Sequence, residues 1–212
     1  MSMEITVGIL AGGKSTRMGT NKAFLPYKQT TFIEAIAKEC EAFSNIILSV
    51  NDLETYKDVG YELVQDEIGG FGPLEGVYQI LKKADTDFVL ILAADMPYIN
   101  KTFLSKFSSC LDNPDLLKNE QGEMPGCIVL RADNMLEPLC SLYSRKTLPF
   151  IKEMREKKEH KLRMLYERVY TRYIEIESLG YTKQIIKNIN TQEEYKKIIE
   201  VKDKNERIEI KG

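Results

Sequence analysis

The sequence predicts an α/β fold of three layers with a mostly parallel central sheet. Four apolar stretches have the length of buried strands, at residues 5–10, 45–50, 61–65 and 87–92. Segments with a helical pattern lie between them, and this alternation builds a parallel sheet with helices on its two faces. The 212 residues are enough for one ordinary domain with a sizeable buried core.

Three helices are expected in the first half of the chain. Thr31 and Glu34 form a capping-box pair, which opens a helix that ends near Phe43. Pro73 stands at the first position of a second helix, whose apolar residues recur with helical spacing on one face. Asn100 is placed to cap a third helix. These helices connect strands that run in the same direction.

The second half of the chain alternates less regularly. We expect a polar, exposed connection at 112–126. After it come two strands, a helix, another strand and a short strand end, at 127–130, 139–142, 144–157, 170–176 and 187–190. Thr191 opens a last helix through a second capping box. Residues 1–201 are expected to form one domain, and the charged residues 202–212 a tail.

Composition and charge exclude several classes of protein. The formal net charge is −2 and charged residues of both signs are mixed, so no nucleic-acid surface is expected. No apolar run is long enough for a membrane span, and the N-terminus lacks a signal-peptide pattern, which predicts a cytoplasmic protein. Cys40, Cys110, Cys127 and Cys140 lack the paired spacing of a zinc site and are expected to be reduced thiols. His160, the only histidine, lies in a polar stretch.

The segment after the first strand has the composition of a phosphate-binding loop. Residues 10–22 read L-A-G-G-K-S-T-R-M-G-T-N-K. Glycines such as Gly12 and Gly13 let backbone N–H groups converge on an anion, and the cations Arg17 and Lys22 can neutralise its charge. Neither the Walker loop nor the dinucleotide fingerprint G-x-G-x-x-G occurs in the chain, so the two commonest nucleotide-binding loops are excluded.

Polar side chains also follow the other three strands of the first half. Asn51 comes after the second strand, Asp66 after the third and Asp95 after the fourth. Ligands of open parallel sheets bind beyond the carboxyl ends of the strands, so these residues are expected to share one site. Asn51 and Asp66 have an alternative explanation as turn residues, and Asp95 as a helix cap. Because Asn100 suits the capping position better, we favour Asp95 as a Mg²⁺ ligand.

Together, these motifs resemble those of the molybdenum cofactor guanylyltransferases. The resemblance extends from residue 5 to about 200 and implies a Rossmann-like nucleotidyltransferase fold over the domain 1–201. In the second half it includes Glu137-Pro138-Leu139 leading into Tyr143. The matching motifs are L-A-G-G…R-M-G-x-x-K at 10–22, Asn51, Asp66 with G-P-L-x-G at 72–76, D-M-P at 95–97, and N-x-N-T at 188–191.

The resemblance implies transfer of GMP from GTP to the terminal phosphate of molybdopterin, with or without bound molybdenum, and release of pyrophosphate. Arg17 would hold the β and γ phosphates, Lys22 would stabilise charge at the α phosphate, and Asp95 would hold Mg²⁺. The resemblance is also compatible with transient contacts to other molybdenum cofactor proteins. It implies guanine and ribose contacts from Leu10, Ala11, Gly12, Asn51 and Asp66, while the bare backbone at Gly13 leaves room for a purine.

The acceptor is expected to meet Asn188 and Asn190, which the resemblance places near the metal and the pterin phosphate. If residues 187–190 form a strand, the two asparagines lie on one face and Ile189 on the other. Ile189 is apolar and should enter the core, which would turn both asparagines toward the cleft. The alternative is that Asn190 merely precedes the helix capped by Thr191.

Three other functions fit parts of the pattern. A cytidylyltransferase for the same pterin would share most motifs, and a sugar-phosphate nucleotidyltransferase would share the glycine-rich loop. A nucleotide-binding subunit without activity is the third. Arg17, Lys22 and Asp95 occur together here, and mere binding does not require all three, so we favour an enzyme.

Overall fold

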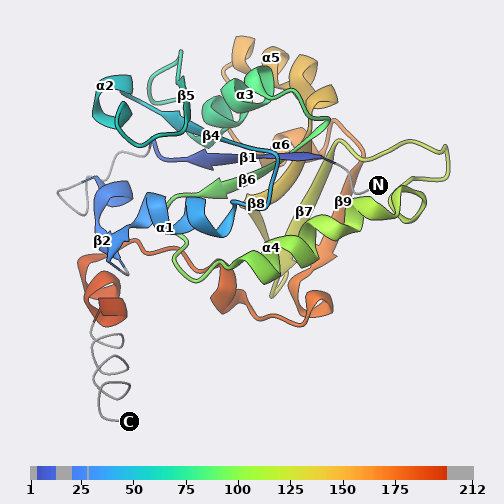
Figure 1. The fold of residues 1–212 in the computed structure, drawn as a ribbon. Coiled ribbons are helices and arrows are strands. Elements are labelled where there is room, and N and C mark those ends of the chain that lie inside the picture. The colour runs from blue at the N-terminus through green and yellow to red at the C-terminus, as the bar shows by residue number, and fades with distance from the viewer. Residues whose placement is uncertain (1–3, 13–20, 28, 200–212) are drawn as a thin grey trace.

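The structure is a computed structural model, and it describes residues 4–12, 21–27 and 29–199. These residues form a seven-stranded sheet in the order β5-β4-β1-β6-β8-β7-β9 (Figure 1). Among the described strands of this sheet, β8 alone runs against the others. The strands are β1 (Ile5–Leu10), β4 (Asn45–Val50), β5 (Glu62–Gln65), β6 (Phe88–Ala93), β7 (Cys127–Ala132), β8 (Met135–Ser144) and β9 (Thr171–Glu175).

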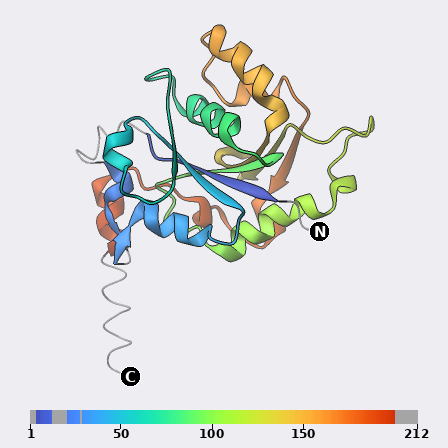
Figure 2. The ribbon, with the colours of Figure 1, turned by 45° about the horizontal axis from the view of Figure 1, so that its top comes forward.

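Helices cover both faces of the sheet, which confirms the predicted three-layer α/β fold. α3 and α5 lie on one face and α1 and α4 on the other (Figures 1 and 2). A small hairpin of β2 (Pro26–Tyr27) and β3 (Thr30–Thr31) precedes α1. The α-helices are α1 (Phe32–Glu39), α2 (Leu53–Tyr56), α3 (Pro73–Lys83), α4 (Lys101–Ser108), α5 (Leu148–Glu156) and α6 (Arg163–Tyr166), followed by a helix over 192–199.

The predicted helix starts are confirmed by their hydrogen bonds. Thr31 and Glu34 form the complete capping box of α1, although that helix ends at Glu39 rather than near Phe43. Asn100 accepts a hydrogen bond from Phe103 N at 2.9 Å and so caps α4. Pro73 is the first residue of α3, where a missing N–H costs nothing.

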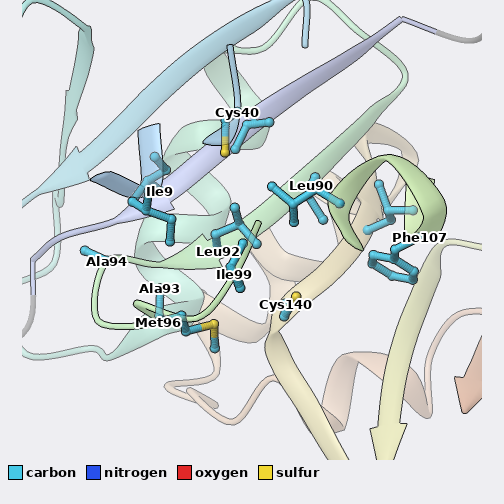
Figure 3. Close-up of a cluster of buried hydrophobic side chains, with 14 of the residues drawn as sticks. Ile9, Cys40, Leu90, Leu92, Ala93, Ala94, Met96, Ile99, Phe107 and Cys140 are labelled. Carbon is cyan, nitrogen blue, oxygen red and sulfur yellow. The ribbon is translucent and has the colours of Figure 1, made fainter. Parts of the chain in front are cut away.

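Two apolar clusters fill the space between the layers, and alternate residues of the same strands supply both. In β6, Leu90 and Leu92 face α1 and α4, whereas Val89 and Ile91 face α3 and α5. All four side chains are fully buried, as expected for a strand covered on both faces. Figure 3 shows Leu90 and Leu92 within the first cluster, to which Phe107 of α4 also belongs. The sheet is therefore held from both sides.

Strand β8 carries an irregularity that the sequence did not predict. Opposite β7, the register passes from Ser141 to Glu137, so that three residues of β8 bulge out of the ladder. Pro138 is one of them and has no N–H to donate to a ladder. The Ser141 hydroxyl replaces lost backbone contacts: it donates to Glu137 O at 2.7 Å and accepts from Leu130 N at 3.3 Å. On its other side β8 keeps a regular register with β6, where Cys140 pairs with Leu92, so the neighbouring Leu139 lies near the carboxyl end of β6.

Two expectations for the second half need correction. Residues 187–190 form no strand, because the backbone there meets a loop rather than a sheet edge: Ile189 N donates to Asp95 O at 2.9 Å. The connection 112–126 is mostly exposed, as predicted, but Leu117 is buried and its carbonyl accepts a hydrogen bond from Tyr170. The helix after Thr191 is present, with its capping box.

Several predictions concern residues outside the described ranges. The tail 202–212 lies outside the described residues, as do Gly13 and Arg17. Within the described ranges, no helix is both long enough and apolar enough to cross a membrane. All four cysteines are free, as predicted, and Cys110 alone among them is not fully buried.

The centre of the sheet should not accept a side chain at Gly8. A Cβ atom there would lie 2.6 Å from Ile80 Cγ2 and 2.8 Å from both Ile80 Cδ1 and Ile91 Cδ1. We expect Gly8→Ala to lower the free energy of unfolding by about 1–3 kcal/mol, measured by urea denaturation. In an Ile80→Val background, which removes one of these methyl groups, the penalty should shrink. An unchanged unfolding midpoint for Gly8→Ala would contradict this packing.

Candidate active site

A cavity of about 570 Å³ opens at the carboxyl ends of β1, β4, β5 and β6. This is the edge at which the sequence predicts a shared site. Most of the predicted site residues that the structure describes line it, and Leu139 of the β8 bulge adds an apolar side. The lining residues are Leu10, Ala11, Gly12, Asn21, Lys22, Ala23, Ser49, Asn51, Asp66, Gly69, Gly70, Gly72, Pro73, Gly76, Ala93, Ala94, Asp95 and Leu139.

The first loop continues the hydrogen-bond ladder of the sheet beyond the end of β1. Ala11 N donates to Ser49 O at 2.9 Å, and Leu10 O accepts from Ala94 N at 3.1 Å. The carbonyl of Ala11 is held in turn by the Tyr56 hydroxyl at 2.8 Å. The backbone of Leu10 and Ala11 is therefore fixed on both sides before it borders the cavity. A ligand would meet a preformed surface here.

Gly12 permits a close approach between this loop and the end of β4. A Cβ atom at Gly12 would lie 3.2 Å from Asn51 N, 3.4 Å from Val50 C and 3.5 Å from Asp66 Oδ2. Two of these neighbours are backbone atoms, which cannot rotate away. The missing side chain thus brings three predicted site residues, Gly12, Asn51 and Asp66, to one wall of the cavity.

Asp66 has a defined environment in this wall. Its Oδ1 accepts a hydrogen bond from Ser49 Oγ at 2.9 Å, and its backbone N donates to Val50 O at 3.1 Å. Burial raises the pKa of the Asp66 carboxyl, the hydrogen bond from Ser49 opposes that rise, and the charge of Glu75 adds to it. A partly desolvated carboxylate is a strong hydrogen-bond acceptor for a ligand. Asn51 is exposed, and its backbone carbonyl accepts from Gln65.

Lys22 joins two of the predicted site residues. It begins a short 3-10 helix, Lys22–Phe24, and its Nζ lies 3.1 Å from Asp95 Oδ2 and 2.9 Å from Asn190 Oδ1. The side chains of Lys22 and Asp95 are 18% and 21% exposed, so the pair borders the cavity without being closed off from it. Asp95 does not cap α4, since Asn100 has that position. The cap explanation for Asp95 is therefore wrong.

Residues 188–190 reach this cluster from the far end of the chain. Ile189 is 1% exposed and enters the core, as predicted, although without a strand. Asn190 contacts Lys22 through its side chain, and its backbone N also donates to Glu194 Oε2 at 2.9 Å. Asn188 Oδ1 is buried and has no hydrogen-bond partner among the residues that the structure describes. A buried amide oxygen without a partner is unusual and suits a ligand.

The oxygen donors around Asp95 suit a hard divalent cation. Asp95 has a carboxylate, and Asn190 brings an amide oxygen to the same lysine, Lys22. Asn188 adds a buried amide oxygen next to Ile189, whose backbone N donates to Asp95 O. In the described ranges, no three histidine, cysteine, aspartate or glutamate side chains gather at a metal-binding distance. These oxygen donors resemble magnesium sites in which one or two carboxylates share the ion with phosphate and water, and differ from the sulfur and nitrogen ligands typical of structural zinc sites.

Glu137 is a carboxylate near the site whose individual role the sequence did not reveal. It precedes Pro138 at the β8 bulge, and Leu139 N donates to its Oε1 at 3.3 Å. Burial raises the pKa of Glu137, and the negative charge of Asp95 raises it further. The electrostatic influence of Asp95 indicates that the second half of the chain brings a carboxylate, Glu137, toward Asp95. A proline within a strand pattern was the available signal.

The arrangement defines a class of protein. A preformed backbone loop, a lysine paired with an aspartate, and oxygen donors at the strand ends match a site for a nucleoside triphosphate with a divalent cation. The model of the MobA-like NTP transferase domain matches residues 7–173.

Two named relatives refine the class. A probable molybdenum cofactor guanylyltransferase of Clostridium perfringens is 31% identical over 205 residues, covering 93% of this chain and 98% of the relative. A molybdenum cofactor guanylyltransferase of Syntrophotalea carbinolica is 32% identical over 193 residues, covering 89% and 88%. The chain therefore belongs to the MobA-like NTP transferase family, a family of nucleotidyltransferases, and is grouped by sequence with its molybdenum cofactor guanylyltransferases.

Solved structures support the same fold. The molybdopterin-guanine dinucleotide biosynthesis protein A of Archaeoglobus fulgidus aligns with a TM-score of 0.74 and 21% identity, covering 94% of this chain and 99% of that protein. At this identity the likeness concerns the fold alone.

The close approach at Gly12 yields a test of the cavity wall. Because a Cβ atom there meets backbone of β4, Gly12→Ala should displace the wall and weaken binding of a nucleoside triphosphate about tenfold, measured by titration calorimetry. Gly69→Ala is the matched control: Gly69 also lines the cavity, but a Cβ atom there meets nothing within 4 Å. Equal affinity of the two variants would contradict the role assigned to Gly12.

Proposed function

We propose that this protein transfers GMP from GTP to the terminal phosphate of molybdopterin and releases pyrophosphate. The observation that carries the proposal is the cluster of Lys22, Asp95 and Asn190, of which Lys22 and Asp95 line the cavity at the four strand ends. The names of the relatives support the choice of nucleotide and acceptor. Transfer of this kind needs no covalent protein nucleophile, because the acceptor phosphate itself attacks.

The guanine base is assigned to the wall formed by Gly12, Asn51 and Asp66. Guanine carries an N–H and an amino group side by side, and a carboxylate can accept both. Asp66 has such a carboxylate, and the hydrogen bond from Ser49 Oγ to its Oδ1 orients it. The backbone of Leu10 and Ala11 would contact the base and ribose. Gly13, outside the described residues, completes this loop in the proposal.

The phosphates are assigned to the cations and to Mg²⁺. Asp95, with amide oxygens of Asn188 and Asn190, would hold the ion, which when bound neutralises charge on the triphosphate oxygens. Lys22 would leave its present contacts and stabilise the charge that develops at the α phosphate. Arg17 is proposed to hold the β and γ phosphates; it too lies outside the described residues.

The chemical step is an in-line displacement at the α phosphorus. An oxygen of the acceptor's terminal phosphate forms a bond to this phosphorus while the bond to the bridging oxygen of the β phosphate breaks. The electron pair leaves with pyrophosphate, and GMP remains on the acceptor. The protein contributes alignment of the two phosphates and neutralisation of charge. Asn188, Asn190 and the β8 bulge with Glu137 and Leu139 would border the acceptor.

The proposal extends to the setting of the reaction. The domain 1–201 would act on small molecules, in the cytoplasm, with molybdopterin that is free of metal or already carries molybdenum. Four free cysteines support a reducing compartment. Other molybdenum cofactor proteins would meet it transiently to deliver and collect the pterin.

A pyrophosphate-release assay with and without molybdopterin tests the function. Wild-type protein with GTP and Mg²⁺ should release pyrophosphate only when the acceptor is present. Release with CTP instead would favour the cytidylyltransferase alternative, and release with a sugar 1-phosphate would favour a sugar nucleotidyltransferase. Nucleotide binding with no release for any acceptor would favour a binding subunit.

GTP should be preferred over CTP by at least about tenfold, and Asp66 should be the reason. Asp66→Asn keeps the size of the side chain but replaces one acceptor oxygen by a donor, which faces the donors of guanine. The variant should lose most of the preference for GTP while its melting temperature stays close to that of wild type. The ratio of kcat/KM for the two nucleotides measures this, and an unchanged ratio would refute the base assignment.

Substitutions of Asp95 and of Lys22 should each lower kcat, for different reasons. Asp95→Ala should lower kcat by about 100-fold or more, because it removes a metal ligand at the developing charge. Lys22→Ala should lower kcat more than it weakens GTP binding, since the lysine is needed most in the transition state. Circular dichroism controls for the fold. Near-normal turnover of Asp95→Ala in saturating Mg²⁺ would contradict the metal assignment, and a pure affinity effect of Lys22→Ala would contradict its role.

A further inference from the structure

We propose that Arg155 of α5 is a positioning residue for the nucleotide: it holds the loop 66–72 in the conformation that forms one side of the cavity. The inference rests on the proposed function only in naming GTP as the ligand. Arg155 does not line the cavity. It acts through two glutamates, Glu75 and Glu67, which connect it to the loop.

The first connection is a buried bidentate ion pair. Arg155 Nε donates to Glu75 Oε2 at 2.8 Å, and its Nη2 donates to Glu75 Oε1 at 2.9 Å. The Glu75 side chain has no exposed surface, and that of Arg155 is 11% exposed. A buried carboxylate of this kind needs its cation, since an unpaired charge in the interior is costly. α3 and α5 are therefore fastened together directly behind the loop.

The second connection reaches the loop itself. Glu75 Oε1 also accepts from the backbone N of Glu67 at 3.1 Å and from Gln79 Nε2 at 2.8 Å. The Glu67 carboxylate receives Arg155 Nη2 at 2.9 Å, with Lys82 Nζ at 3.1 Å. Arg155 thus contacts Glu67 in two ways. It binds the Glu67 carboxylate directly, and it binds Glu75, which accepts the backbone N–H of Glu67. Glu67 is the residue after Asp66, so these contacts hold the backbone beside Asp66, whose carboxylate also accepts a hydrogen bond from Ser49.

Only arginine fits this position. Its guanidinium contacts two carboxylates and also lies over the ring of Tyr78, at 4.1 Å from the centroid. A lysine has one compact charge and cannot hold a bidentate pair, reach a second carboxylate and stack on an aromatic ring. Hydrogen bonds from Arg155, and then from Lys82, lower the pKa of the Glu67 carboxyl to about 2, so it stays ionised.

The segment that follows α5 touches the loop 66–72 at a second point. The ring of Phe71, near the end of the loop, meets the ring of His160 edge-on at a centroid distance of 6.2 Å. His160 lies between α5 and α6. Arg155 and His160 therefore support the loop near its two ends, and the glycines Gly69 and Gly70 between them face the cavity. Three glycines within 69–72 give this stretch little rigidity of its own, so outside contacts must supply it.

An ion pair can also serve stability alone, and the test separates the two roles. Glu67→Gln removes the loop-side charge while leaving the buried Arg155–Glu75 pair intact, so the fold should survive. Arg155→Lys keeps the charge but loses the bidentate geometry. Glu153→Gln is the matched control, because Glu153 forms an exposed ion pair with Lys157 on the same helix and touches no loop residue of the cavity.

The measurements are GTP binding by titration calorimetry in the presence of Mg²⁺, amide hydrogen exchange of residues 67–72, and the melting temperature. We expect Glu67→Gln and Arg155→Lys to weaken GTP binding about tenfold and to speed exchange in the loop, with Glu153→Gln like wild type. Glu67→Gln should melt like the control. Under turnover with molybdopterin, KM for GTP should rise while kcat stays within about twofold.

Unchanged GTP affinity and unchanged loop exchange in Glu67→Gln, with only a lower melting temperature in Arg155→Lys, would overturn the proposal. Binding and exchange are measured on the nucleotide alone. If wild-type protein bound GTP but transferred nothing to molybdopterin, the proposed reaction would fail, while these two readouts would still decide the role of Arg155.

Discussion

The site depends on one constraint, the register of β1 between β4 and β6. Leu10 pairs with Ser49 on one side and with Ala93 on the other, so three strands end at the same level. Backbone hydrogen bonds extend this alignment into the loops: Ala94 N, for example, donates to Leu10 O. Because the strands are parallel, their carboxyl ends meet at one edge, and every polar residue that follows them is delivered there.

Two groups of contacts hold the polar residues of this edge: hydrogen bonds around Asp66, and the ion pair of Lys22 with Asp95. The wall around Asp66 is fixed by hydrogen bonds and partly desolvated, which favours selective reading of a base. The side chains of Lys22 and Asp95 are 18% and 21% exposed and border the cavity, so a ligand in the cavity can reach both charges. In the proposed reaction, the wall around Asp66 would face the base, and Lys22 with Asp95 would face the phosphates.

Much of the fold and of the site could be predicted, because both follow local rules. Strand 87–92 was visible as a continuous apolar run, and the cap at Asn100 removed the competing explanation for Asp95. The strand predicted at 187–190 failed for a physical reason. Its alternation of Asn and Ile was read as strand periodicity, whereas Ile189 is held by one backbone hydrogen bond to Asp95 and by burial of its side chain.

What escaped prediction is long-range. The partners Arg155 and Glu75 are 80 positions apart, and no local pattern indicates that a charged residue on one helix will be neutralised by another helix. The three-residue bulge of β8 depends on how Ser141 satisfies backbone groups across the ladder, which also needs the partner strand. Such features appear only when the layers are assembled. They determine how the cavity wall is held in place, whereas most of the residues that line the cavity follow the strand ends and could be predicted.

The central claim is that an acceptor phosphate attacks the α phosphorus of GTP in this cavity. The most direct measurement follows the fate of isotope-labelled phosphate with molybdopterin as acceptor. Label in the α position of GTP should appear in a pterin dinucleotide, whereas label in the γ position should appear only in pyrophosphate. Recovery of the γ label as inorganic phosphate, or on the pterin, with no α label in the product, would contradict it.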